Sequence, residues 1–306
     1  MAKKTISIFG CTGSVGTTTL DIIRENKEQF EVKVLTANKN IDDLILFANE
    51  FNPEAICFNN ESDLEKVQHE INTDKMEYYI GDEGLLECAK ICTDIVVAGI
   101  VGLAGLRPLL ESIKNSKKVC IANKECFVSA GSLIMSEAKK YEAQILPLDS
   151  EHSAIFQILN SSNNKLKDIY LTASGGPFYG YTKEELLDVE VQDAIKNPNW
   201  TMGKKISVDS ATMMNKIFEI VEAKKIFNIE LNKFEILIHP KSYIHAIVKL
   251  KNGLIKIIAH DTDMKIPITN SIYMGDNNQI FVNSKKINMS ILNSLNLQKV
   301  KIKKFP

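Results

Sequence analysis

Three neighbouring residues, Asp149-Ser150-Glu151, place two carboxylates on either side of a hydroxyl. They follow an apolar run at residues 145–148, which is typical of a buried strand, and precede a segment with helical apolar spacing. Two carboxylates this close repel each other, and a shared divalent cation keeps both ionised. We therefore predict a divalent-metal site at a strand-to-helix junction, the edge of an α/β sheet where ligands usually bind. A polar loop in which Asp149 or Ser150 caps the helix is the alternative.

A second polar group lies on a predicted helix that begins at Asp209. Asp209 would cap this helix, and Ser210 would lie in its first turn. Asn215 and Glu219 are four residues apart and share a helix face, and Lys216 follows Asn215 directly. This face suits an ammonium beside a phosphate and a carboxylate beside a metal ion. An ordinary Lys–Glu pair on the surface is the alternative.

Two loops contain residues suited to binding a small molecule. A predicted strand at residues 168–173 ends at Ser174 and two glycines, which offer a hydroxyl and N–H groups to an anion or a sugar. Further on, the Pro- and Gly-bounded segment 197–205 contains the only tryptophan, Trp200. Such a loop could cover a site and exclude water. A core tryptophan that anchors the loop is the alternative.

The start of the chain has the pattern of a dinucleotide-binding fold. An apolar run at residues 5–9 precedes Gly10, Gly13 and Gly16, and a helical pattern follows. This order lets backbone N–H groups and a helix N-terminus approach a pyrophosphate. The second predicted strand is not followed by the acid that is usual in NAD-binding folds, and Lys39 could instead meet a 2′-phosphate. NADP is therefore favoured over NAD, and a solvated loop lysine is the alternative.

The order of the predicted elements indicates two domains. Helical and strand patterns alternate up to residue 148, as in a doubly wound parallel sheet. Beyond it, two β-rich runs are joined by the hairpin signal Asn252-Gly253, and His239 and His245 near the first run are expected to be buried structural histidines. We predict an α/β chain with a Rossmann-like NADP-binding domain (residues 1–148), an α+β catalytic domain (residues 149–285) and a tail (residues 286–306).

Composition excludes several classes of partner. A chain of 306 residues with 44% apolar residues and a net charge of -1 is typical of a globular protein, with no reason to expect nucleic acid or a membrane. All six cysteines lie in the first 126 residues without a Cys-x-x-Cys pair, which favours reduced thiols. Neither a signal peptide nor an apolar run of about 20 residues is recognisable. We expect a cytoplasmic protein, or one of an organelle stroma if a targeting segment has been removed.

Together these runs resemble the 1-deoxy-D-xylulose 5-phosphate reductoisomerase family of the non-mevalonate isoprenoid pathway. The matching runs follow the family's order: residues 10–16, 122–125, 147–157, 172–178, 198–203, 207–216 with Glu219, and 239–245. The resemblance implies an enzyme that rearranges the ketose phosphate to an aldehyde and reduces it with NADPH to 2-C-methyl-D-erythritol 4-phosphate. It also implies a homodimer that uses Mg²⁺ or Mn²⁺, with Co²⁺ a further option.

The resemblance also implies roles for particular residues. Asp149, Glu151 and Glu219 correspond to metal ligands, and Lys124 completes the catalytic set. The implied substrate-binding residues are Ser150, Ser174, Asn197, Trp200, Ser210, Asn215 and Lys216. The implied cofactor contacts are Thr12, Gly13, Ser14, Val15, Lys39, Asn40, Asn123, Glu125, Met202 and Gly203.

Three departures from the family pattern lead to further expectations. Asn197 stands where the family has a histidine and cannot titrate near neutral pH, so we expect weaker phosphate binding or a slower step. Ile217 and Phe218 replace a Gly-Leu pair, which is expected to alter packing beside Glu219. The family's C-terminal helical domain is absent from this chain, so residues 286–306 are expected to begin the linker to it.

Two alternatives to a reductoisomerase stay open. One is a truncated or degenerate relative that binds NADPH or a sugar phosphate with little turnover. The other is an unrelated NADP-dependent dehydrogenase that shares only the first domain and needs no metal.

Overall fold

The chain divides into two compact units. The computed structural model describes residues 2–73, 75–196, 200, 203–275, 282 and 286–300. The first unit comprises Met1–Leu148 together with Ile268–Asp276, and the second comprises Asp149–Pro267 together with Asn277–Pro306. The return of the chain to the first unit at Ile268 was not anticipated from the sequence, which assigned residues 149–285 to one domain.

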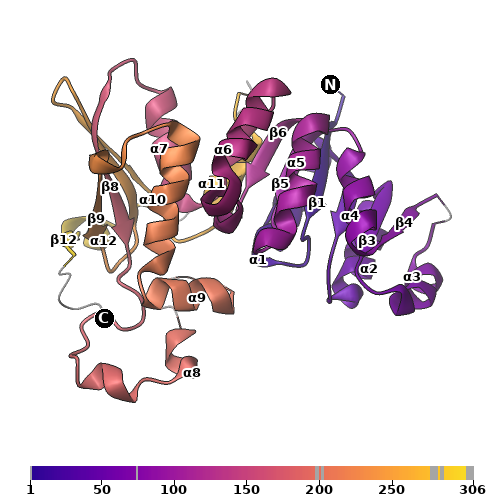
Figure 1. The fold of residues 1–306 in the computed structure, drawn as a ribbon, viewed down its shortest axis with the longest axis horizontal. Helices are drawn as coiled ribbons and strands as arrows, with labels where there is room; N and C mark the ends of the chain where they lie inside the picture. Colours follow the sequence, from indigo (N-terminus) through magenta and orange to yellow (C-terminus); the bar gives the residue numbers. More distant parts are fainter. Residues whose placement is uncertain are drawn as a thin grey trace. The chain divides into compact units, whose positions relative to one another are not determined.

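A seven-stranded sheet forms the centre of the first unit (Figure 1). Its order is β4-β3-β2-β1-β5-β6-β7, and every neighbouring pair is parallel, so the predicted Rossmann-like fold is confirmed. All four residues of β3 are buried, as expected of a parallel strand covered on both faces. The strands are β1 (Lys4–Phe9), β2 (Phe30–Thr36), β3 (Ala55–Phe58), β4 (Glu77–Ile80), β5 (Thr93–Ala98), β6 (Ser116–Ile121) and β7 (Gln144–Pro147).

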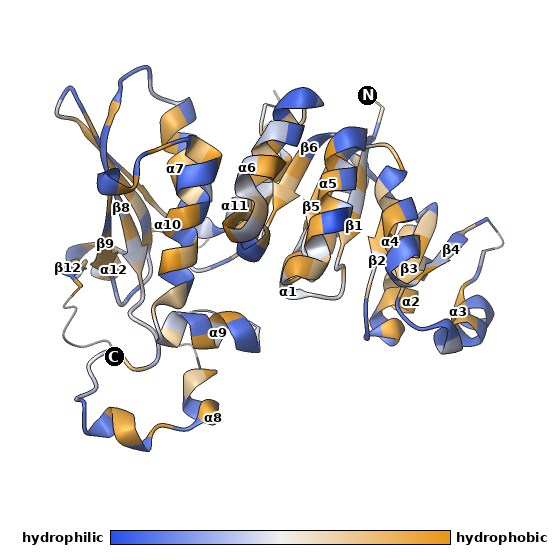
Figure 2. Cartoon of the chain, viewed as in Figure 1, coloured by the Kyte–Doolittle hydropathy of each residue, from blue (hydrophilic) through white to orange (hydrophobic). Residues whose placement is uncertain are grey.

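The helices of this unit are amphipathic, and Figure 2 shows orange and blue on different sides of α5. The buried residues of α5 include Pro108, Leu109 and Ile113, which recur at helical spacing. The helices are α1 (Ser14–Glu25), α2 (Ile41–Phe51), α3 (Leu64–Glu70), α4 (Gly81–Lys90), α5 (Leu106–Asn115) and α6 (Lys124–Lys140), with short 3₁₀ turns at Glu61–Asp63 and Leu103–Gly105. Strand β4 was missed from the sequence because this edge strand has no alternating apolar pattern.

The returning segment completes the first unit. It contains the end of α11 (Lys265–Ile272). The Ser271 hydroxyl donates a hydrogen bond to the Pro147 carbonyl oxygen at 2.8 Å. The Tyr273 ring packs edge-on against Phe30 with centroids 5.5 Å apart. A short segment distant in the sequence therefore belongs to the core of this unit.

The strand order reverses between β1 and β5, which is the point where open α/β sheets bind ligands. Gly10 directly follows β1 and has a φ of 83°, which favours glycine. Gly99 directly follows β5, and a Cβ atom built there would lie 3.0 Å from the Phe9 carbonyl oxygen. The two chain segments therefore approach closely at the predicted dinucleotide site.

A five-stranded sheet of order β11-β10-β8-β9-β12 forms the second unit. The β8–β9 pair is parallel and the other pairs are antiparallel. The predicted hairpin joins β10 to β11, and Gly253 adopts a φ of 90° in its turn. The strands are β8 (Leu166–Ala173), β9 (Phe234–Ile238), β10 (Ile244–Leu250), β11 (Ile255–Ala259) and β12 (Gln298–Lys299).

Helix α7 packs on this sheet, α10 packs against α7, and both helices contribute side chains to the core. The helices of the second unit are α7 (Ser150–Asn160), α8 (Val191–Ala194), α9 (Lys204–Ala211), α10 (Met214–Phe227) and α12 (Met289–Asn293), with 3₁₀ turns at Glu185–Asp188 and Leu231–Lys233. The buried core consists of Ala154, Ile155, Ile158, Ile169, Leu171, Ala246, Val248 and Leu250. Among the described residues, no helix combines the length and the apolar character needed to cross a membrane.

The predicted helix that begins at Asp209 is wrong. Asp209 and Ser210 lie in the last turn of α9, which ends at Ala211. Met213 then adopts a left-handed conformation with a φ of 61°, and α10 begins at Met214. A methionine at positive φ has no local sequence signal, so the break was not detectable.

Candidate active site

The first turn of α7 fixes the two neighbouring carboxylates. Asp149 is the N-cap of α7, and its Oδ1 accepts a hydrogen bond from the His152 backbone N–H at 2.6 Å. The Ser150 hydroxyl donates to Glu151 Oε2 at 2.5 Å. The capping alternative is therefore a correct description of Asp149. It is compatible with a metal site because the cap holds the carboxylate in a defined direction.

The buried face of α10 is charged. Its buried residues are Lys216, Glu219, Glu222 and Ala223, whereas Ile217 is 51% exposed. Charged side chains are rarely buried unless they are paired or bind an ion. The three charged residues recur every three positions and lie on one side of the helix. The bulk of Ile217 lies on the opposite, exposed side, so the packing change expected there does not fall on the charged face.

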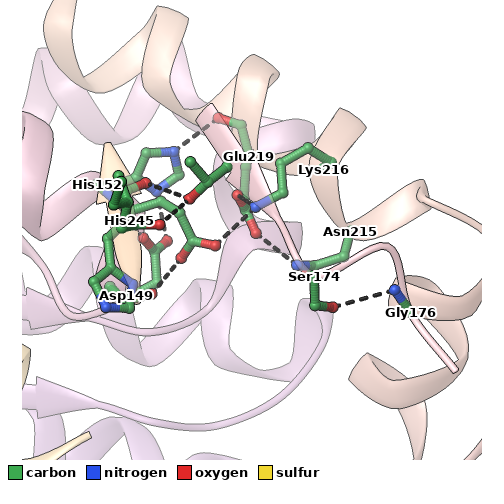
Figure 3. Close-up of polar contacts among 12 residues, drawn as sticks. Asp149, His152, Ser174, Gly176, Asn215, Lys216, Glu219 and His245 are labelled. Carbon is green, nitrogen blue, oxygen red and sulfur yellow. Dashed lines mark hydrogen bonds and ion pairs between the residues drawn. The ribbon is translucent and has the colours of Figure 1, made fainter. Parts of the chain in front are cut away.

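Lys216 joins two of the predicted metal ligands. Its Nζ donates to Glu151 Oε1 at 2.7 Å and to Glu219 Oε2 at 2.6 Å (Figure 3). The Asn215 amide donates to Glu219 Oε1 at 2.5 Å. Burial acts to lower the pKa of Lys216, but the carboxylates of Glu151 and Glu219 outweigh it and raise that pKa. This pair is buried and charged, so the alternative of a surface Lys–Glu pair is wrong.

His152 links α7 to α10. Its side chain is fully buried, and its Nδ1 is hydrogen bonded to Asp149 Oδ2. The same Nδ1 lies 3.3 Å from Glu222 Oε2, and Nε2 lies 2.8 Å from the Glu219 carbonyl oxygen. Burial acts to lower the pKa of His152, but the charges of Asp149 and Glu222 raise it well above its ordinary value.

Two sets of possible metal ligands overlap in this cluster. Ligand atoms of Asp149, His152 and Glu222 all lie within 4.8 Å of one another. Glu151 and Glu219 both contact one ammonium. Because both ring nitrogens of His152 are already hydrogen bonded, and because Mg²⁺ prefers oxygen ligands, we favour the three predicted carboxylates. Asp149, Glu151 and Glu219 belong to the same unit, and their chemistry fits a divalent cation.

The predicted phosphate-binding residues also belong to this unit. The Ser174 hydroxyl accepts a hydrogen bond from the Gly176 N–H at 3.1 Å (Figure 3). A Cβ atom built on Gly176 would lie 2.6 Å from the Ser210 carbonyl oxygen, so the glycine turn packs directly against the end of α9. Asn215 and Lys216 lie in the first turn of α10, directly after the break.

A stacked pair of histidines contacts the tryptophan. The rings of His245 and His260 lie 3.7 Å apart at 19°, and the Trp200 ring meets His245 edge-on at 6.0 Å. His245 Nε2 donates to the His260 carbonyl oxygen at 3.0 Å. Burial, assisted by the neighbouring His260, lowers the pKa of His245 to about 4, and burial also lowers that of His260. Both rings are therefore uncharged near neutral pH.

The turn after β1 can accept a pyrophosphate. The N-cap of α1 is Gly13, which has no side chain that could cap the helix. Residues 14–17, all of them described, include no acidic side chain. A Cβ atom built on Gly16 would lie 2.4 Å from the Gly10 carbonyl oxygen, so only glycine fits there. First-turn N–H groups and the positive end of α1 can therefore meet a phosphate. The predicted cofactor residues Thr12, Gly13, Ser14 and Val15 form this turn, and their contacts with NADPH stay predictions.

Lys39 and Asn40 follow β2 in the same unit. Asn40 caps α2 by accepting a hydrogen bond from the Asp43 N–H at 3.3 Å. Lys39 is exposed, so its ammonium can reach a ligand phosphate or remain solvated. Its role at the 2′-phosphate stays a prediction.

Asn123 holds the loops after β5 and β6 together. Its amide donates to the carbonyl oxygens of Ile100 at 2.5 Å and Gly102 at 2.7 Å, and its Oδ1 accepts from the Cys126 N–H at 3.1 Å. Lys124 and Glu125 follow in the first turn of α6, and Lys124 is buried. The side chain of Asn123 is thus used within the protein, and it can assist the cofactor by fixing these loops.

The structure describes only some of the remaining predicted site residues. Gly203 is the exposed N-cap of α9, whereas Asn197 and Met202 lie outside the described residues. No role was predicted for His152, Glu222 or His260. The available signal was a spacing of three residues, between Asp149 and His152 and between Glu219 and Glu222.

Family models and curated relatives match this chain to the same family of enzymes. A model of 1-deoxy-D-xylulose 5-phosphate reductoisomerase matches residues 6–131, and the model of that enzyme's C-terminal domain matches residues 145–227. The curated reductoisomerases of Pelagibacter ubique and Agathobacter rectalis are 43% and 45% identical over 306 and 273 residues. These alignments cover 99% and 88% of this chain and 78% and 71% of the two relatives.

Solved structures agree. The Zymomonas mobilis reductoisomerase in complex with NADPH has a TM-score of 0.91 at 35% identity, covering 100% of this chain and 79% of that one. A DOX-P reductoisomerase in complex with NADPH, fosmidomycin and magnesium has a TM-score of 0.91 at 35% identity, covering 99% and 77%. The fold and the sites define an α/β protein with a dinucleotide-binding unit and a carboxylate-rich unit. The chain belongs to the 1-deoxy-D-xylulose 5-phosphate reductoisomerase family, which confirms the resemblance inferred from the sequence.

Proposed function

We propose that this chain converts 1-deoxy-D-xylulose 5-phosphate to 2-C-methyl-D-erythritol 4-phosphate, using NADPH and a divalent cation. The observation that carries the proposal is the buried cluster in which one ammonium joins Glu151 and Glu219. Family membership and a solved relative in complex with NADPH, fosmidomycin and magnesium support it.

The carboxylates of Asp149, Glu151 and Glu219 would hold the cation. A bound divalent cation supplies Lewis-acid polarisation of the substrate carbonyl and of a neighbouring hydroxyl oxygen. The chain contributes the directions of the three carboxylates, through the cap at Asp149 and the hydrogen bonds to Glu151 and Glu219. Ser150 would contact the substrate next to the cation.

The turn at Ser174 and the start of α10 would bind the substrate phosphate. The hydroxyls of Ser174 and Ser210, the Asn215 amide and the Lys216 ammonium are all donors to phosphate oxygens. Binding energy from this group, which does not react, would orient the reacting carbons. Trp200 would cover the substrate and exclude water.

The first unit would bind NADPH. The N-terminus of α1 and its glycine turn would hold the pyrophosphate, and Lys39 would meet the 2′-phosphate. Asn123 would position the backbone of the loops after β5 and β6 against the cofactor.

A metal-dependent NADPH oxidation assay tests this function. We expect oxidation only when substrate and divalent cation are both present. Because Lewis-acid catalysis supplies several kcal/mol, Glu219→Gln should lower kcat/KM by at least about 100-fold. The exposed strand residue Glu235 is the matched control, and Glu235→Gln should leave kcat/KM unchanged.

The same assay distinguishes the alternatives. Full activity in a chelator would favour a metal-independent dehydrogenase. Thermal stabilisation by NADPH and by substrate, without any product, would favour a relative that binds without turnover. Either result would overturn the proposed reaction.

We also propose a homodimer formed through β11. Leu254, Ile255 and Ile257 are 57%, 59% and 52% exposed on or next to this edge strand. Exposed apolar edge strands pair readily with a second chain. Light scattering should give twice the 34.3 kDa mass of the chain, and Ile257→Lys should give the single mass. A monomeric wild-type chain would contradict this proposal.

Three further expectations concern the choice of metal ion, the cellular compartment and the role of residue 197. Mn²⁺ and Co²⁺ should replace Mg²⁺, because oxygen ligands suit all three ions. All six cysteines are free, which is compatible with the cytoplasm. Asn197→His should raise kcat/KM, because histidine can carry a positive charge near neutral pH and asparagine cannot. If activity does not rise, our interpretation of that position is wrong.

A further inference from the structure

His152 is hydrogen bonded at both ring nitrogens to groups on two different helices. On α7, Asp149 Oδ2 contacts its Nδ1. On α10, the Glu219 carbonyl oxygen lies 2.8 Å from its Nε2, and Glu222 Oε2 lies 3.3 Å from its Nδ1. One imidazole ring therefore connects the side chain of one proposed metal ligand to the backbone of another.

We propose that His152 is a positioning residue that sets the separation of Asp149 and Glu219 and thereby the affinity of the site for its divalent cation. This inference rests on the proposed function for the identity of the three metal ligands. It assigns to His152 no contact with the cation or the substrate, and Glu222 is the residue that supports its Nδ1.

Several neighbouring groups fix the orientation of the His152 ring. The side chain of His152 is 0% exposed, and the Phe227 ring packs against it with centroids 6.2 Å apart. A carbonyl oxygen only accepts hydrogen bonds, so Nε2 must donate to Glu219. A flipped or rotated ring would lose this bond and the contact of Nδ1 with Asp149. The ring thus has one arrangement in which both contacts are made.

Such a connection matters because Asp149 is the N-cap of α7 and Glu219 lies on α10, so the separation of these two residues depends on contacts between the helices. The side chain of Glu219 is held by Asn215 and Lys216 from its own helix. Lys216 also reaches Glu151, but Asp149 is connected to α10 through His152. Hydrogen bonds that orient metal ligands typically change metal affinity by about 10- to 100-fold when they are removed.

Three substitutions separate the two contacts. His152→Phe keeps a ring against Phe227 and loses both hydrogen bonds. His152→Asn can retain a donor near the Nδ1 position, towards Asp149, and His152→Gln can retain one near the Nε2 position, towards Glu219. The exposed His69 on α3 provides the matched control, His69→Phe.

Mn²⁺ binding to the whole chain, followed by electron paramagnetic resonance, is the main measurement. We expect His152→Phe to raise the Mn²⁺ Kd by about 10- to 100-fold, and the Asn and Gln variants to give intermediate values. His69→Phe should bind Mn²⁺ as the wild type does. The Kd for NADPH, which measures the first unit, should be unchanged in all variants. An unchanged Mn²⁺ Kd in His152→Phe would overturn the proposal. If His152→Phe does not fold, unchanged Mn²⁺ affinity in both the Asn and Gln variants would overturn it equally.

Activity provides the second readout. If His152 positions the ligands, saturating Mn²⁺ should restore kcat in the Asn and Gln variants, with a raised Mn²⁺ concentration for half-activation. A kcat that stays low at saturating Mn²⁺ would mean that His152 acts in the reaction itself and would overturn the positioning role. A wild-type chain that binds Mn²⁺ but consumes no NADPH would contradict the proposed function alone, because the Mn²⁺ measurements still decide the role of His152.

Discussion

The Lys216 ammonium lies 2.6 Å from the Glu219 carboxylate, and both side chains are buried on the same face of α10. Lys216 also contacts Glu151 on α7 at 2.7 Å. Its single positive charge offsets the repulsion between two carboxylates that come from different parts of the sequence. Charge therefore holds the cluster together on the buried face of α10, whereas the buried residues of a helix such as α5 are mainly apolar.

Lys216→Met is expected to destabilise the protein by about 3 kcal/mol, because two buried carboxylates would lose their ammonium. Urea or thermal unfolding in a chelator measures this loss, and added Mn²⁺ should recover more stability in the variant than in the wild type. Lys90→Met is the control, because Lys90 pairs with Glu87 at the same helical spacing and at 2.6 Å but is half exposed. That control should change stability by no more than about 0.5 kcal/mol. Equal losses in the two variants would contradict our interpretation.

Gly16→Ala should damage the dinucleotide-binding unit. The added Cβ would lie 2.4 Å from the Gly10 carbonyl oxygen, so the turn must shift, at a cost of about 1–3 kcal/mol. We expect a lower thermal midpoint and a raised Kd for NADPH. Gly13→Ala is the matched change in the same turn, because its Cβ would lie 3.4 Å from the same oxygen and its φ is -83°. If Gly13→Ala lowers the thermal midpoint as much as Gly16→Ala does, the close approach of the Gly10 carbonyl oxygen is not the reason why residue 16 is a glycine.

His245 should make the protein less stable in acid. Its pKa is about 4 in the folded chain and near 6.5 when unfolded, so the unfolded state binds more protons between these values. This contribution is complete above the unfolded pKa and is lost as the pH falls towards the folded one. Between about pH 7.5 and about pH 5 the loss is about 2 kcal/mol.

His245→Phe keeps an aromatic ring beside His260 and removes the titrating group. Stability near neutral pH should fall, because the hydrogen bond to the His260 carbonyl oxygen is lost. The further decrease towards pH 5 should be smaller than in the wild type, as measured by unfolding at both pH values. His69→Phe, at an exposed position, should keep the wild-type slope. A variant slope equal to that of the wild type would rule out His245 as the source.

Alkylation of the native protein should occur at Cys92 alone. Cys92 is exposed and the other five thiols are buried. Burial raises the pKa of Cys11 and Cys120 to about 12, so these groups are not thiolates near neutral pH. Mass spectrometry should show one adduct on the wild type, none on Cys92→Ser, and six on the unfolded wild-type chain. Early modification of Cys11, which lies in the glycine turn, would show that the turn opens readily.

Local patterns predicted most of the fold. The run from β1 through Gly10 and Gly16 to α1 has the composition of a phosphate-binding turn, and Asn252-Gly253 predicted the hairpin between β10 and β11. These elements are determined by residues close together in the sequence. The break at Met213 was missed because it needs a left-handed methionine, which the surrounding packing must impose.

The candidate site was less accessible from the sequence. The carboxylates of Asp149, Glu151 and Glu219 were predicted as metal ligands from an acid pair and a family resemblance. The contact between His152 and Glu219 joins positions 67 residues apart, and no spacing rule indicates it. Spacing predicted a polar face of α10 with Lys216 and Glu219, but not that this face is buried or that it includes Glu222, because periodicity arguments assume that the buried side of a helix is apolar.

The return of Ile268–Asp276 to the first unit has a practical consequence for anyone who wishes to divide this protein. The chain passes from one unit to the other three times, so neither unit can be expressed as one uninterrupted stretch. A fragment ending at Leu148 would leave the Pro147 carbonyl oxygen without its Ser271 donor and the Phe30 ring without Tyr273. A soluble cofactor-binding fragment would need the returning segment grafted back through an engineered linker.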